Sequence, residues 1–109
     1  MEENMHFKKY DKVFTADDIH LGDVLRIHFR QDGVNPELRL YASYLEVWSV
    51  EFATRFFVPT DYIDEYDAGA GEIYLTETMQ TVQIETWDRT PSFIAGNLSR
   101  RQELSVAVS

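Results

Sequence analysis

The sequence contains no cysteine, which excludes disulfide bonds, zinc sites with thiolate ligands and cysteine nucleophiles. It also contains no apolar run of the roughly 20 residues that a membrane-spanning helix needs. The first residues, Met1 to His6, show no basic segment followed by an apolar one, so no signal peptide is predicted. Together these absences predict a cytoplasmic protein that does not bind a membrane.

Glycine and proline are scarce, and neither occurs between Pro36 and Pro59. Within this stretch, large apolar side chains recur at spacings of three and four residues, which is typical of an amphipathic helix. The residues with this spacing are Leu38, Tyr41, Leu45, Trp48, Phe52 and Phe56. A helix start is also present, because Asn35 supplies a cap, Pro36 a first-turn proline and Glu37 a first-turn acid. The pattern predicts one helix of about five turns.

The same stretch is also compatible with strands. Trp48, Val50 and Phe52 recur at every second position, and valine and aromatic residues favour strands. No turn residue, however, divides the stretch into two strands of ordinary length. Helix is therefore the main prediction, and strands over residues 37–58 are the alternative.

Shorter elements complete the predicted fold. Residues 23–30 alternate cleanly and predict a half-buried strand with Arg26, His28 and Arg30 on its outer face. Further predictions are strands at 72–77, 81–87 and 104–108, a helical turn between Thr15 and Gly22, and loops at 59–71 and 88–99. The expected fold class is α+β, with one long amphipathic helix packed on a small, mostly antiparallel sheet. The alternative is an all-β barrel or sandwich. Residues 1–109 are expected to form a single domain, with residues 1–6 frayed.

Basic residues are absent from one third of the chain. The 33 residues between Arg55 and Arg89 contain eight acidic residues and no lysine or arginine, whereas the whole chain has a net charge of −9. Tyrosines lie among these acids, and tyrosine is a frequent anchor in protein interfaces. The candidate binding residues are Asp61, Tyr62, Asp64, Glu65, Tyr66, Asp67 and Glu72. The competing interpretation is an acidic loop and hairpin that are simply solvated.

Motifs that would identify a reaction are missing. The carboxylates at Asp61, Asp64 and Asp67 do not follow the spacing of a calcium loop, so no metal site is predicted. No serine lies in a nucleophile elbow, and Gly69-Ala70-Gly71 is not a dinucleotide loop. We therefore expect no cofactor and no catalysis. Direct binding of nucleic acid is not expected either, because the net negative charge repels phosphate.

The leading functional hypothesis is a non-enzymatic acidic module that binds a protein partner with a basic surface. Carboxylates at phosphate-like spacing would let it occlude a nucleic-acid-binding surface, as small phage anti-defence and immunity-type inhibitors do; the analogy is one of charge and size. One alternative is an assembly protein that forms homo-oligomers through the predicted edge strand at 104–108. Another is a small-molecule-binding domain with an apolar pocket between helix and sheet.

Overall fold

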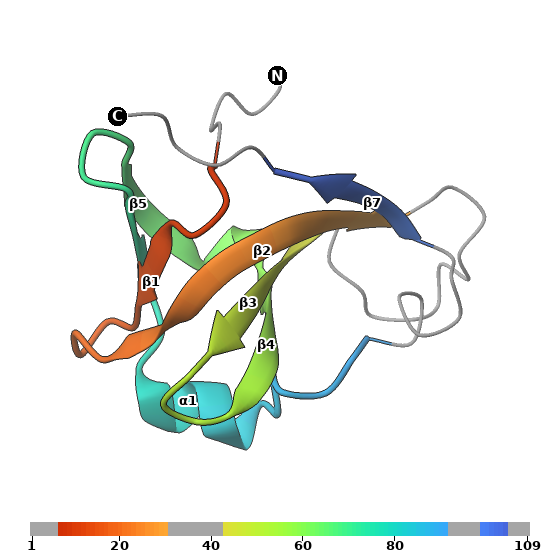
Figure 1. Cartoon of the computed structure of the whole chain (residues 1–109). Coiled ribbons are helices and arrows are strands. Elements are labelled where there is room, and N and C mark those ends of the chain that lie inside the picture. The colour runs from red at the N-terminus through yellow and green to blue at the C-terminus, as the bar shows by residue number, and fades with distance from the viewer. Residues whose placement is uncertain (1–6, 31–42, 92–98, 105–109) are drawn as a thin grey trace.

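The protein is dominated by β-strands. The structure, a computed structural model, describes residues 7–30, 43–91 and 99–104 (Figure 1). Its strands are β1 (Lys12–Phe14), β2 (His20–Arg30), β3 (Ser43–Ser49), β4 (Thr54–Pro59), β5 (Ile63–Asp67), β6 (Glu72–Leu75) and β7 (Ser99–Glu103). The helical elements are the 3₁₀ turn η1 (Thr60–Tyr62) and the six-residue helix α1 (Met79–Ile84). Within the described residues, no helix is long and apolar enough to cross a membrane.

The predicted long helix is wrong. Residues 43–59 of the predicted helix form the antiparallel hairpin of β3 and β4, which the strand alternative anticipated. Side chains alternate between two faces here: Leu45 and Val47 lie in the core, whereas Tyr44, Glu46 and Trp48 lie on the other face, where Tyr44 and Glu46 are also buried and Trp48 is exposed. The hairpin turns at residues 50–53 without glycine or proline, because Ala53 adopts a positive φ of 53°. A turn made by alanine leaves no signal in the sequence, so the α+β prediction failed at this point.

Three shorter predictions also need correction. The predicted strand at 81–87 is largely the helix α1, and the predicted loop at 59–71 contains the strand β5. The predicted helical turn after Thr15 is not a helix but a single turn, in which the N–H of Asp18 donates to the carbonyl of Thr15 at 2.9 Å, and β2 starts at His20. The predicted strand at 23–30 is confirmed and is longer than expected. The predicted C-terminal strand at 104–108 falls almost wholly outside the described residues, and the last described strand, β7, ends at Glu103.

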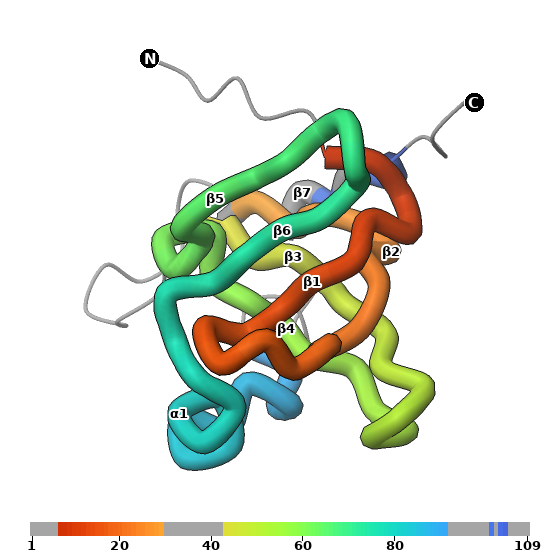
Figure 2. The backbone as a smooth tube through the Cα atoms, turned by 90° about the vertical axis from the view of Figure 1, so that its left-hand side faces the viewer, coloured from red at the N-terminus to blue at the C-terminus, as the bar shows by residue number. Residues whose placement is uncertain are grey.

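The sheet curls until its two edges approach each other. Its strand order is β4-β3-β2-β1-β6-β5, and β7 pairs with the second half of β2. All of these pairs are antiparallel except β1 with β6, which is parallel. Because β4 and β5 stand at opposite ends of this order and are joined only by the three residues of η1, the sheet must fold round on itself (Figure 2).

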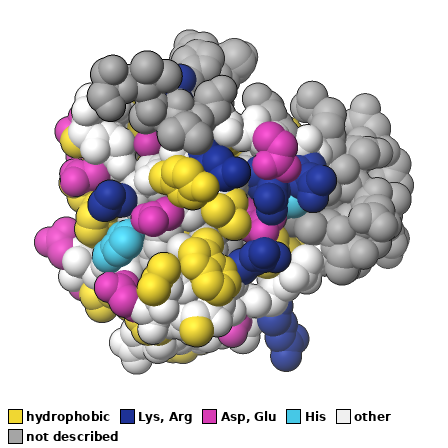
Figure 3. All heavy atoms as spheres, viewed as in Figure 1, with side chains coloured by type: hydrophobic (Ala, Val, Ile, Leu, Met, Phe, Trp, Pro, Cys, Tyr) yellow, Lys and Arg dark blue, Asp and Glu magenta, His cyan; other side chains and the backbone are white. Residues whose placement is uncertain are grey.

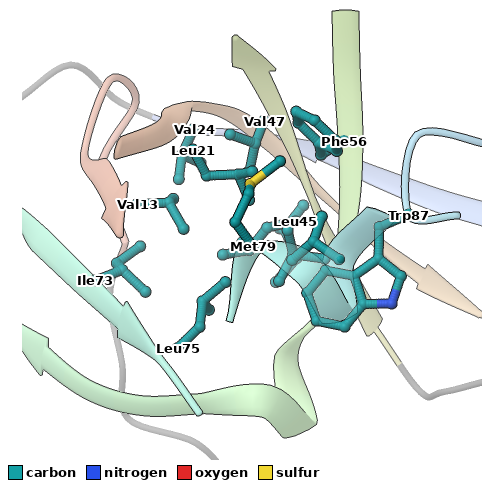
Figure 4. Close-up of a cluster of buried hydrophobic side chains, with 13 residues drawn as sticks. Val13, Leu21, Val24, Leu45, Val47, Phe56, Ile73, Leu75, Met79 and Trp87 are labelled. Carbon is teal, nitrogen blue, oxygen red and sulfur yellow. The ribbon is translucent and has the colours of Figure 1, made fainter. Parts of the chain in front are cut away.

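The core lies inside this curl. Buried aliphatic side chains from β1, β2, β3, β4 and β6 converge there, and Met79 and Val82 of α1 close one end together with Trp87 (Figure 4). A close approach of two strands explains Gly22 in β2. A Cβ atom at this position would lie 2.4 Å from the carbonyl oxygen of Trp48 in β3, so any side chain would push the strands apart.

Helix α1 is short, but both of its ends are capped. At its start, the backbone N–H of Met79 donates to Asp17 Oδ1 at 3.1 Å, and Thr78 caps the first turn. At its end, the N–H groups of Thr86 and Trp87 donate to the carbonyls of Gln83 and Val82, which is a Schellman motif. Thr86 adopts a φ of 54° at the position where glycine is usual. The caps and the burial of two side chains hold a helix that would not form in isolation.

Candidate functional site

The predicted acidic residues cluster on the outside of β5 and β6. Strand pairing sets Glu65 opposite Tyr74 and Asp67 opposite Glu72. Asp64 is the extra residue of a bulge in β5, and it is exposed, as are Glu65 and Asp67. We call the group formed by Asp18, Asp64, Glu65, Asp67 and Glu72 the acidic face.

Tyr74 lies in the middle of the acidic face, and the neighbouring carboxylates affect the pKa of its hydroxyl. Its hydroxyl donates to Glu72, and this hydrogen bond raises the pKa of Tyr74 to about 12. The negative charges of Asp67 and Asp18 act in the same direction, because ionised tyrosine would be repelled by them. Tyr74 also stacks on Phe14 of β1, with ring centroids 5.6 Å apart. The acidic face therefore has an aromatic centre that is fixed in place.

A shallow groove crosses the acidic face. Its volume is about 410 Å³, and the carboxylates of Asp18, Asp64 and Glu65 lie along it together with Tyr74. Asp18 comes from the bend between β1 and β2, far from the other acids in sequence. Sequence reasoning missed Asp18 because it placed this residue in the helical turn predicted between Thr15 and Gly22. Its positive φ of 63° is the only local sign of an unusual position.

The two predicted tyrosine anchors serve the fold instead of the surface. The hydroxyl of Tyr66 donates to Asp11 Oδ2 at 2.8 Å, and its ring packs on Phe7 at 4.9 Å. Burial raises the pKa of Tyr66, and the hydrogen bond to Asp11 adds to this effect. Tyr62 packs on Trp87, with ring centroids 5.3 Å apart. Both rings are half-buried and hold β5 and η1 against the rest of the molecule.

Asp61 lies apart from these residues. It is exposed in the first turn of η1, and neither the groove nor the surroundings of Tyr74 includes it. Among the described residues, no group of three or more carboxylate or histidine side chains is arranged to hold a metal ion.

A second charged surface covers the outside of β2, β3, β4 and β7. At its centre is Glu46 of β3, whose side chain is only 4% exposed. Three cationic or imidazole groups surround its carboxylate: Arg26 Nη1 at 2.9 Å, His28 Nε2 at 2.7 Å and Arg55 Nε at 3.4 Å. Arg26 also pairs through Nε with Glu103 of β7 at 2.9 Å, and Arg101 Nε lies 3.3 Å from the same carboxylate.

We call the surface formed by Arg26, Trp48, Arg55 and Arg101 around Glu46 the arginine face. Figure 3 shows Lys and Arg side chains gathered over β2, β3 and β7, next to hydrophobic ones. The basic outer face predicted for β2 is confirmed for Arg26 and His28. Both side chains pair with Glu46, because β3 is the neighbour of β2.

The surroundings of Glu46 keep it ionised. Burial alone would raise its pKa, but the hydrogen bonds from His28 and Arg26 and the charge of Arg26 lower it from 4.5 to about 2. A buried carboxylate with several charged donors fixes the positions of their side chains. The arginine face is therefore pre-arranged, whereas the carboxylates of the acidic face point into solvent.

A small cavity with a mixed lining, which includes the polar side chains of Thr54 and Gln83, lies between α1 and the β3–β4 hairpin. Its volume is about 270 Å³, and Phe52, Phe56, Met79 and Val82 line it, with Asp88 as its charged member. Phe52 and Phe56 meet edge to face at 6.1 Å. This cavity is smaller than the roughly 300–1,000 Å³ of typical ligand sites.

Comparison of the chain with protein-family models, with curated proteins and with solved structures gives no match.

Proposed function

We propose that this protein is a non-enzymatic binding module that docks a partner protein with a basic surface through its acidic face. The observation that carries the proposal is the grouping of carboxylates around one groove: Asp18, Asp64 and Glu65 line it together with Tyr74, whose hydroxyl donates to Glu72. It means that carboxylates from three separate chain segments add their fields at one place on the surface.

The geometry supports docking in two further ways. The groove between Asp18 and Glu65 is open and lined by acids, so the end of a lysine or arginine side chain could enter it. Tyr66 and Tyr62 fix β5 and η1 to the core, so the acids are presented by a rigid element. Opposite charges would speed the encounter, and a rigid surface would lose little entropy on binding.

The proposed biological action is occlusion. Carboxylates held at the edge of a sheet can occupy a groove that otherwise binds phosphates, so the partner would be an enzyme or regulator that binds nucleic acid. Inhibitors of the anti-defence or immunity type act in this manner. The proposal places the protein in the cytoplasm, as the absence of cysteine suggests, and does not involve direct binding of nucleic acid.

The test is a pull-down from a lysate of the native host with a charge-reversed double variant. Asp64→Lys with Glu65→Lys suits this purpose, because both side chains are exposed and neither accepts a hydrogen bond within the described residues. Asp67 is left unchanged because it accepts the N–H of Ala70 at 3.1 Å and supports the β5–β6 turn.

The matched control is Glu85→Lys with Asp88→Lys, two exposed acids beyond α1. Each double variant changes the net charge of −9 by +4, to −5, so a difference between them is due to position alone. We expect the control and the native protein to retain the same partner and D64K/E65K to lose it, at about 0.15 M salt. Equal retention by both folded variants would refute the proposal.

A second candidate function has one observation in its favour, the cavity between α1 and the β3–β4 hairpin. It corresponds to a small-molecule site between helix and sheet, although α1 is much shorter than the helix expected from the sequence. A ligand bound there would raise the melting temperature. A thermal-shift screen of small apolar compounds should give shifts that the cavity-filling variant Val82→Phe abolishes. Shifts that survive this change would place the ligand elsewhere.

A further inference from the structure

The arginine face has the composition of a protein interface. Cores of interfaces are rich in tryptophan, tyrosine and arginine and poor in lysine. Trp48 is 39% exposed near the end of β3, and register places it opposite Arg55 of β4. Arg55 and Arg101 are 57% and 60% exposed, and both pair with a carboxylate through Nε.

A protein suits this surface better than nucleic acid does. Glu46 and Glu103 lie among the arginines, and a carboxylate next to a phosphate site repels the phosphate. No lysine of the described residues takes part in the ion pairs of this surface. The net charge of −9 adds a long-range repulsion of nucleic acid. The expected occupant is therefore a protein surface with a few carboxylates beside an apolar or aromatic group.

The same chain carries such a surface. The acidic face presents Asp64, Glu65 and Asp67 around the stacked ring of Tyr74. The acidic and arginine faces lie on different strands, β5 and β6 for the first and β2, β3, β4 and β7 for the second, and β5 and β7 are well separated in Figure 1. A contact between the two faces therefore joins two copies and leaves one face of each kind free.

We propose that copies of this chain associate head to tail, with the acidic face of one copy docked on the arginine face of the next. The inference rests on the proposed function in one respect: it makes a second copy a competitor of the basic partner for the acidic face. Because the contact is heterologous, association continues beyond the dimer. Because every copy carries the same net negative charge, the contact is weak, and a tightly bound basic partner displaces it.

The first measurement is sedimentation velocity of the full chain at rising concentration in about 0.15 M salt. The average mass is expected to rise without stopping at the dimer. Trp48→Ala should weaken association about tenfold or more, as loss of a central tryptophan does in other interfaces. Arg55→Gln with Arg101→Gln should also weaken it, whereas the control Lys8→Gln with Arg89→Gln, which removes the same charge elsewhere, should not.

Complementation identifies the two faces as each other's partners. D64K/E65K keeps its arginine face and R55Q/R101Q keeps its acidic face, so each variant alone should be monomeric. An equimolar mixture should form a 1:1 complex that grows no further, because only one functional pair of faces is present. A mixture that stays monomeric, or a native protein that stays monomeric at all concentrations, would overturn the inference.

Further outcomes distinguish head-to-tail association from the proposed function and from nucleic-acid binding. If R55Q/R101Q loses association but retains the partner found by pull-down, the inference and the proposed function both stand. If the native protein stays monomeric but D64K/E65K still loses that partner, only the inference fails. Binding of a labelled single-stranded oligonucleotide that R55Q/R101Q abolishes would identify the arginine face as a nucleic-acid site and would also overturn the inference.

Discussion

The carboxylates of the two charged faces differ in burial and in ion pairing. On the arginine face, Glu46 is buried and shares its two oxygens among Arg26, His28 and Arg55. On the acidic face, Asp64 and Glu65 are exposed and make no ion pair within the described residues. Glu46 thus helps to hold the sheet together, whereas Asp64 and Glu65 contribute little to the fold.

The largest effect on the free energy of unfolding is expected from a substitution at the centre of the arginine face. Glu46→Gln should lower the free energy of unfolding by about 3 to 5 kcal/mol, because removing one member of a buried ion cluster leaves the others unpaired. Urea denaturation measures this loss. Glu103→Gln is the control: its side chain is 55% exposed, and its loss should cost about 1 kcal/mol or less. Equal losses of unfolding free energy in the two variants would mean that Glu46 is solvated like Glu103.

The pH dependence of stability should follow Glu46. Its pKa is lowered from 4.5 to about 2 in the folded protein, so its contribution is complete above pH 4.5 and is lost as the pH falls toward 2. By linkage this loss amounts to about 3 kcal/mol. Urea unfolding at a series of acidic pH values should show it in the native protein and in D64K/E65K. If E46Q shows the same acid loss as the native protein, other carboxylates are responsible for it.

A smaller effect is expected where the acidic face is joined to the core. Tyr66→Phe removes the hydrogen bond to Asp11 and should lower the free energy of unfolding by about 1.5 kcal/mol, since Asp11 is a buried acceptor. Tyr10→Phe removes an exposed hydroxyl from a ring 52% exposed and should have no measurable effect. If the two changes cost the same, β5 is held by packing alone and the acidic face is less rigid than proposed.

The smallest effect is expected on the exposed acids themselves. D64K/E65K should change the free energy of unfolding by no more than about 0.5 kcal/mol, because exposed charges away from caps and cores rarely matter more. Urea denaturation of this variant should overlay that of the native protein, even though the partner is lost. A large destabilisation would show that these carboxylates support the fold and would remove the contrast between the two faces.

The errors in the sequence-based fold have a common physical origin. Residues 43–59 show apolar positions at both the helical and the strand period, and the hairpin turn contains no glycine or proline. Residues 81–87 alternate like a strand, yet Thr78 and Asp17 cap a helix start there. In both places the local pattern is ambiguous, and burial against distant strands decides between the possibilities.

The candidate site was predicted in part. Sequence reasoning found Asp64, Glu65, Asp67 and Glu72 from the missing basic residues, because a run of charge needs no tertiary information. It assigned Tyr62 and Tyr66 to the binding surface, although both are half-buried. The sequence alone does not distinguish an aromatic residue of an interface from one that packs on the core. It missed Asp18 and the arginine face, whose members come from separate strands.

The sequence by itself determined that cysteine chemistry is excluded, where negative charge accumulates and that residues 23–30 form a strand with a basic outer side. Only the tertiary structure decided that Glu46 is buried among Arg26, His28 and Arg55, and that Asp18 joins the acids of β5. The physical reason is that composition and the alternation of residues along a strand are local properties of the chain. Burial and charge pairing instead depend on which strands become neighbours when the sheet curls.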